Sequence, residues 1–90
     1  MPLTTVLVTA HWTLERYSER ARVSCDVALL QDDDDRGFYE LRVTLNGAPA
    51  YARLWNSHGA VMADADAALR DFLNAGWTEC RSVDGTIAGR

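Results

Sequence analysis

Residues 38–55, FYELRVTLNGAPAYARLW, decide the fold because they contain two alternating strands joined by a two-residue turn. Asn46-Gly47 is the strongest short signal for a hairpin, since a type I′ turn needs positive φ at both central residues. The turn places Leu45 opposite Ala48. The first strand then has an apolar face that consists of Tyr39, Leu41, Val43 and Leu45.

The same turn sets every pair along the hairpin if both strands are regular, because successive side chains point to opposite faces of a sheet. The predicted pairs on the apolar face are Val43 with Ala50, Leu41 with Ala52, and Tyr39 with Leu54. The predicted pairs on the other face are Arg42 with Tyr51, Glu40 with Arg53, and Phe38 with Trp55.

Two more strands are predicted before the hairpin. Residues 4–15 and 21–30 alternate apolar and polar side chains with period two, although a helix over residues 12–22 is the alternative for the end of the first segment. Leu29 opposite Tyr39 would also set Asp26 opposite Arg42, and both pairs are favourable. Residues 31–37 are then a loop in which Gly37 adopts the left-handed conformation.

After Trp55 the apolar residues recur at helical spacing, which predicts an amphipathic helix over residues 59–75. Ser57 is the predicted N-cap, and Gly76 the predicted C-terminal stop. We expect the helix to lie on the apolar face of the hairpin, where Ala65 and Ala68 permit close approach. Residues 77–83 either add a last strand or cover the core.

These elements predict an α+β, two-layer domain: a four-stranded antiparallel meander with one helix on one face and, as an option, a short C-terminal strand. The strands are expected at about 4–15, 21–30, 38–45 and 48–55, within one globular domain over residues 1–90. This length is near the lower limit for a single core, so a dimer that shares apolar surface is plausible. No apolar run reaches about 20 residues and no signal peptide is evident, so we expect a cytoplasmic chain without a membrane partner.

The net charge of −4 equals that of four consecutive aspartates at positions 32–35, because the other nine acidic residues balance the nine basic ones. Asp32 and Asp34 match the first two ligands of a calcium loop. Arg36 and Val43 then occupy positions that need oxygen ligands, so a solvated hairpin loop is favoured. A metal-binding protein or small metal-dependent enzyme built on this loop is an alternative.

Histidine and cysteine are too widely spaced to predict a zinc site, which usually takes its ligands in closely spaced pairs. The four residues are His11, Cys25, His58 and Cys80. Cys25 alternates with core residues and should be inert, and a disulfide with Cys80 is disfavoured in a reduced compartment. We therefore expect no catalytic residue and no cofactor.

The predicted face away from the helix carries Leu30, Phe38 and Trp55, flanked by Tyr51 and Arg53. Such a cluster has the composition of a protein-binding hot spot, unless Trp12, Trp77 or the C-terminal segment covers it. The leading hypothesis is a small acidic non-enzymatic interaction module whose partner is another protein or a second copy. Size and charge alone also suit an inhibitor or adaptor of phage or mobile-element type, including anti-CRISPR proteins.

A single-stranded nucleic-acid-binding module is the other alternative. Arg42, Arg53 and Tyr51 on an open sheet face would match the arginine and aromatic platforms that stack bases. Asp26 and Glu40 would neutralise these arginines, and the sequence has no general basic patch, so nucleic acid is disfavoured.

Overall fold

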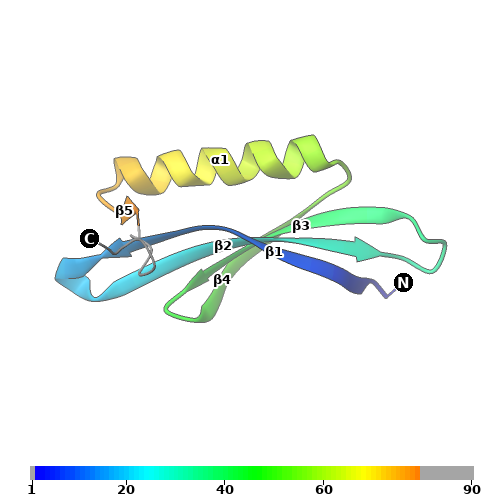
Figure 1. Ribbon diagram of the computed structural model, residues 1–90, viewed down its shortest axis with the longest axis horizontal. Helices are drawn as coiled ribbons and strands as arrows, with labels where there is room; N and C mark the ends of the chain where they lie inside the picture. The colour runs from blue at the N-terminus through cyan, green and yellow to red at the C-terminus, as the bar shows by residue number, and fades with distance from the viewer. Residues whose placement is uncertain (1, 80–90) are drawn as a thin grey trace, which may run out of the picture.

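The computed structural model describes residues 2–79, which form an antiparallel sheet and one helix (Figure 1). The strands are β1 (Thr4–Arg16), β2 (Ala21–Gln31), β3 (Gly37–Leu45), β4 (Ala48–Trp55) and β5 (Thr78–Glu79), and the helix is α1 (His58–Asn74). The α+β class is confirmed, but the sheet has five strands and not four, in the order β4-β3-β2-β1-β5. The additional strand is the short one considered for residues 77–83, of which residues 80–83 lie outside the described range.

The strand prediction for the start of the chain is confirmed, because β1 runs to Arg16 and only a single turn of 3-10 helix (Tyr17–Glu19) follows it. The type I′ turn is confirmed as well: φ is 53° at Asn46 and 84° at Gly47. The backbone N–H of Arg22 donates to Asn46 Oδ1, and Asn46 N–H donates to the Arg22 carbonyl, both at 2.8 Å. The turn is therefore tied to β2.

Both predicted ends of the helix are confirmed. Ser57 is extended, and its Oγ accepts a hydrogen bond from the N–H of Ala60 at 3.1 Å. At the other end, Gly76 has φ of 99°, its N–H donates to Leu73, and Trp77 N–H donates to Phe72. This is the Schellman pattern, and the accompanying apolar contact is between the rings of Phe72 and Trp77, 5.8 Å apart.

The register between β2 and β3 is as predicted, with Leu29 opposite Tyr39, Asp26 opposite Arg42 and Leu30 opposite Phe38. The register between β3 and β4 is correct only at the turn. Thr44 stands opposite Pro49 and Val43 opposite Tyr51, which leaves Ala50 as the extra residue of a bulge. Beyond the bulge, every predicted pair of this hairpin is wrong by one residue.

The bulge has a physical reason in the side chains that it turns toward the helix. Regular pairing would direct Ala50 and Ala52 to the core and leave Tyr51 and Trp55 on the other face. The bulge reverses this arrangement, so that both aromatic residues pack against the core. Burying an aromatic side chain is worth more than burying alanine, and Pro49, which has no N–H to donate, is compatible with an irregular edge strand.

The core lies between α1 and the central strands. One cluster of buried residues joins the helix to three strands: Leu14, Val23, Cys25, Leu41, Val43, Val61 and Ala65. The indole N–H of Trp12 donates to the carbonyl of Ala65 at 3.0 Å. The small side chain of Ala65 allows this close approach between β1 and the helix.

The helix is shorter than the sheet that it covers. With 17 residues, α1 is about 25 Å long, whereas the 13 residues of β1 extend over about 44 Å. Figure 1 shows that the sheet continues beyond the start of the helix, toward the N-terminus and the loop between β2 and β3. This end of the sheet has no helix above it.

Leu41→Ala should lower the free energy of unfolding by about 2–5 kcal/mol, because the leucine is fully buried and its removal leaves a cavity under the helix. Urea denaturation followed by circular dichroism measures the change. Leu54→Ala is the matched control, since Leu54 is 52% exposed and should change stability by less than about 1 kcal/mol. Equal losses in the two variants would contradict this position of the core.

Candidate functional site

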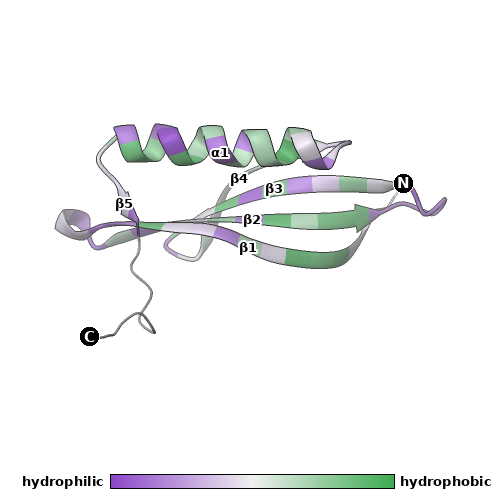
Figure 2. Ribbon diagram, turned by 45° about the horizontal axis from the view of Figure 1, so that its top comes forward, coloured by the Kyte–Doolittle hydropathy of each residue, from purple (hydrophilic) through white to green (hydrophobic). Residues whose placement is uncertain are grey.

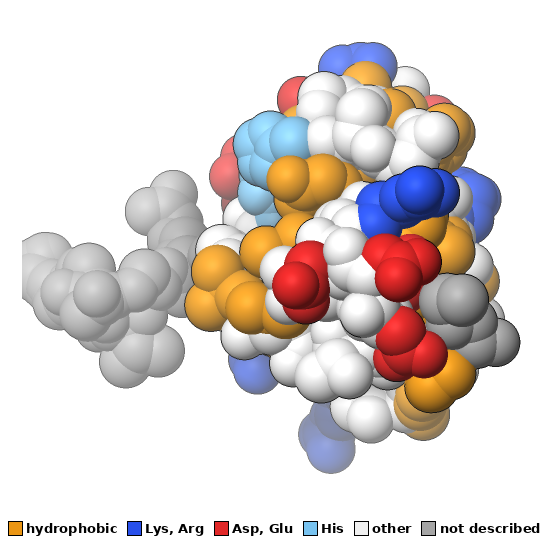
Figure 3. All heavy atoms as spheres, turned by 90° about the vertical axis from the view of Figure 1, so that its right-hand side faces the viewer, with side chains coloured by type: hydrophobic (Ala, Val, Ile, Leu, Met, Phe, Trp, Pro, Cys, Tyr) orange, Lys and Arg blue, Asp and Glu red, His pale blue; other side chains and the backbone are white. Residues whose placement is uncertain are grey.

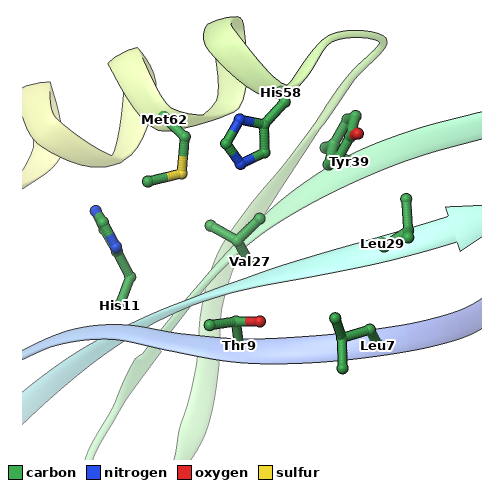
Figure 4. Close-up of a pocket in the computed structure, with 8 residues that line it drawn as sticks. All are labelled: Leu7, Thr9, His11, Val27, Leu29, Tyr39, His58 and Met62. Carbon is green, nitrogen blue, oxygen red and sulfur yellow. The ribbon is translucent and has the colours of Figure 1, made fainter.

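An apolar cleft of about 220 Å³ lies where the first turns of α1 meet the sheet (Figure 4). His58 and Met62 project from the helix toward the strands. The strands supply the other lining residues, which are Leu7, Thr9, His11, Val27, Leu29 and Tyr39. The cleft exists because the helix begins here and leaves the next side chains of the strands without cover.

An exposed apolar patch at the start of the chain adjoins the cleft. It consists of Leu3, which precedes β1, and of Val6, Leu7 and Val8 within β1, which are 38%, 51%, 59% and 45% exposed. Leu7 is opposite Leu29 on the cleft side of the sheet, whereas Val8 is opposite Ala28 on the other side, so the patch covers both faces of this edge strand. Figure 2 shows hydrophobic residues along this part of β1, and Figure 3 looks onto the same end of the molecule, where hydrophobic side chains lie beside histidine and acidic ones. We call the patch and the cleft together the apolar end.

The apolar end also contains an open strand edge. β5 pairs only with Leu14 and Glu15, so within residues 2–79 no strand pairs with the outer side of residues 4–13. Residues 2–14 contain no Asp, Glu, Lys or Arg. Natural edge strands usually carry charges or prolines that prevent pairing, and this edge has two bulges, near Val6 and His11, as its only irregularities.

Two histidines that are isolated in the sequence both line the cleft. His11 Nε2 lies 3.5 Å from Asp66 Oδ1, and the ring of His58 meets that of Tyr39 edge to face at 5.5 Å. The sequence signal that could have indicated this site is the uncharged start of the chain, together with its position beside the predicted helix start. The described thiol, Cys25, is fully buried, and burial raises its pKa to about 12.

The structure does not bring the predicted contact residues together. Leu30 and Phe38 are paired on the face away from the helix, and Leu30 is only 5% exposed. Tyr51, Arg53 and Trp55 lie on the helix side, because the bulge at Ala50 turns them over. The prediction that these residues share one outer face is therefore wrong.

Arg53 and Trp55 instead bind Asp64 of α1. Arg53 donates to both carboxylate oxygens at 2.7 Å, and the Trp55 indole donates to Oδ2 at 2.8 Å. The hydrogen bonds from Arg53 lower the pKa of Asp64 and those to Asp64 raise the pKa of Arg53. The Arg53 guanidinium also stacks on Tyr51, 4.8 Å from the ring centre, while burial raises the pKa of this tyrosine. The cluster joins β4 to the helix.

The arginines proposed for nucleic-acid binding lie on opposite faces of the sheet. Arg42 is on the face away from the helix, where its Nε donates to Glu40 at 2.5 Å and its Nη2 to Thr5 at 3.3 Å. Arg53 is bound to Asp64 on the helix side. The predicted pairing of Glu40 with Arg53 is wrong for the same reason, and no common platform of arginine and aromatic side chains results.

The aspartate loop is organised by its own backbone. Asp32 Oδ1 accepts hydrogen bonds from the N–H groups of Asp34 and Arg36, each at 2.9 Å. The left-handed residue is Asp35, with φ of 61°, and not Gly37 as predicted. Over the described range, no group of three or more His, Cys, Asp or Glu residues is arranged to hold a metal ion.

Comparisons with known proteins give no match to a family model, to a curated protein or to a solved structure. Within residues 2–79, the helix is neither long nor apolar enough to cross a bilayer. Cys80, the fourth residue weighed for zinc and for a disulfide, lies outside the described range.

Asp64→Asn should lower the free energy of unfolding by about 1–2 kcal/mol near neutral pH, because it weakens charge-assisted bonds to Arg53 and Trp55. The pKa of Asp64 is lowered from 3.8 on folding, so its ionised form favours the folded state. That contribution is complete above pH 3.8 and is lost as the pH falls through the folded pKa. The difference in free energy of unfolding between wild type and Asp64→Asn, measured by urea titration, should therefore become smaller below about pH 4.

Asp71→Asn is the matched control, since Asp71 is an exposed carboxylate on the same helix. Its effect on the free energy of unfolding should be no more than about 0.5 kcal/mol. If the difference in free energy of unfolding between wild type and Asp64→Asn became larger in acid, the ionised Asp64 carboxylate would not have the stabilising role given to it here.

Proposed function

We propose that this chain is a non-enzymatic protein-interaction module that binds an apolar segment of a protein partner at its apolar end. The observation that supports this is that three features meet at one end of the sheet: the exposed patch at the start of β1, the cleft under the helix start, and the open edge of the strand. Exposed apolar surface next to a cleft is typical of contact sites.

A protein segment suits these features better than a nucleic acid does. An open strand edge offers backbone N–H and C=O groups to an added strand, while adjacent pockets accept alternate side chains. The cleft supplies such a pocket through Leu7, Leu29 and Met62. No Lys or Arg occurs in residues 2–14 to bind phosphate, and the arginines of the sheet are already paired with acids.

The charge of the molecule lies at one margin of the proposed site. Gln31 is paired with Thr4, so the four aspartates that follow it lie beside the start of β1. Charges at the edge of an interface act mainly on the association rate and on the choice of partner. An inhibitor or adaptor, the class suggested by size and charge, would use a surface of this kind.

Catalysis and metal binding have less support. The thiol of Cys25 is buried within the core, where its raised pKa opposes thiolate formation. His11 and Asp66 form a pair on the cleft rim, but the carboxylate is 59% exposed, so water screens their interaction. The carboxylate of Asp32 is engaged by backbone N–H groups of its own loop.

Capture of partner proteins from a lysate of the source organism, with the full chain as bait, tests the proposed site. Met62→Lys places an ammonium group in the apolar cleft and should reduce recovery of a bound protein by at least about 10-fold. Leu54→Lys is the control, because Leu54 is an exposed apolar residue that does not line the cleft. Recovery that falls equally in both variants, or in neither, would place the contact elsewhere.

A further inference from the structure

We propose that the occupant of the open β1 edge is a second copy of this chain, paired antiparallel about a two-fold axis at Leu7. This inference rests on the proposed function and names the partner at the apolar end. Residues 5–9 read Thr-Val-Leu-Val-Thr, which is the same in both directions. A two-fold axis at Leu7 therefore pairs every residue of this segment with its own kind.

The resulting pairs are favourable. Leu7 meets Leu7 of the partner subunit, Val6 meets Val8 of the partner subunit, and Thr5 meets Thr9 of the partner subunit. Pairs of β-branched residues, and Thr with Thr, stabilise antiparallel sheets when their Cβ atoms are about 4.5–5.5 Å apart. Leu3 then falls opposite His11 of the partner subunit, at the rim of the cleft. Each copy thus adds an apolar side chain beside the other's cleft.

Charge does not oppose self-pairing at this edge. Residues 2–14 carry no acidic residue, lysine or arginine, so no like charges meet across the axis. The aspartate loop of each copy begins next to Thr4, three residues from the axis. The two loops are then at least about 20 Å apart, beyond the Debye length of about 8–10 Å at physiological salt.

The other edge of the sheet is less suited to pairing. β4 contains Pro49, which lacks an N–H group, and has a bulge at Ala50. Both features oppose the addition of a strand. The β1 edge has no proline within its strand, although its two bulges, near Val6 and His11, add twist. The paired segment is therefore short, and apolar side chains supply most of the contact.

Sedimentation equilibrium of the full chain, from about 1 to 200 µM, tests the inference. We expect a dimer with twice the 10.0 kDa mass of the chain. Leu7→Lys should raise the dimer dissociation constant at least about 100-fold, because two ammonium groups would meet at the axis. Leu54→Lys should leave it unchanged. Circular dichroism checks that both variants are folded, as expected for side chains that are more than half exposed.

Oxidative cross-linking tests the register. In a Cys80→Ser background, Leu7→Cys should give a covalent dimer, because residues directly opposite each other in an antiparallel pair are close enough for a disulfide. Leu54→Cys is the control and should give no covalent dimer under the same oxidant. Cys25 is buried in both proteins and does not compete.

The inference is overturned if the full chain is a monomer throughout the concentration range. This holds even if a chain that lacks residues 80–90 forms a dimer. A dimer that Leu7→Lys does not weaken, or that Leu54→Cys cross-links equally well, overturns it too. A monomeric chain that captures another protein in a Met62-dependent way would leave the proposed function standing. Loss of that dependence with the dimer intact would instead count against the cleft as a binding site.

Discussion

The mismatch in length between helix and sheet is the constraint on which the rest of the structure depends. A helix rises about 1.5 Å per residue and a strand about 3.4 Å, so the 17 residues of α1 cannot cover the 13 residues of β1. The helix therefore forms one core over part of the sheet, around Leu14, Leu41 and Val61. The remaining apolar side chains of β1 form the surface that we assign to binding.

The bulge at Ala50 has an equally wide effect, because it decides which side chains join β4 to the helix. It turns Trp55 and Arg53 toward Asp64 and turns Ala52 and Leu54 away. Tyr51 and Trp55 are thereby removed from the outer face, where Phe38, Leu54 and the ion pair of Glu40 with Arg42 remain. Function is consequently expected at one end of the sheet rather than across this face.

The acidic loop and the apolar end lie side by side and have complementary effects. The four aspartates account for the whole net charge, and charge of one sign suppresses non-specific association between copies. An open apolar strand would otherwise be an aggregation risk. A two-fold pairing at Leu7 satisfies both conditions, because it covers the edge while it holds the two loops beyond the range of unscreened repulsion.

Local patterns in the sequence determined the four long strands, the type I′ turn at Asn46-Gly47, the two helix ends and the register of β2 with β3. These features depend on alternation, capping and cross-strand pairs between neighbouring segments, which the order of residues expresses directly. Only the tertiary structure decided the bulge at Ala50, since the energy that favours it comes from contacts of Tyr51 and Trp55 with a helix formed later in the chain. It also decided that His11, His58 and Met62 share a cleft, because the place above the sheet at which the helix begins depends on packing and not on any one segment.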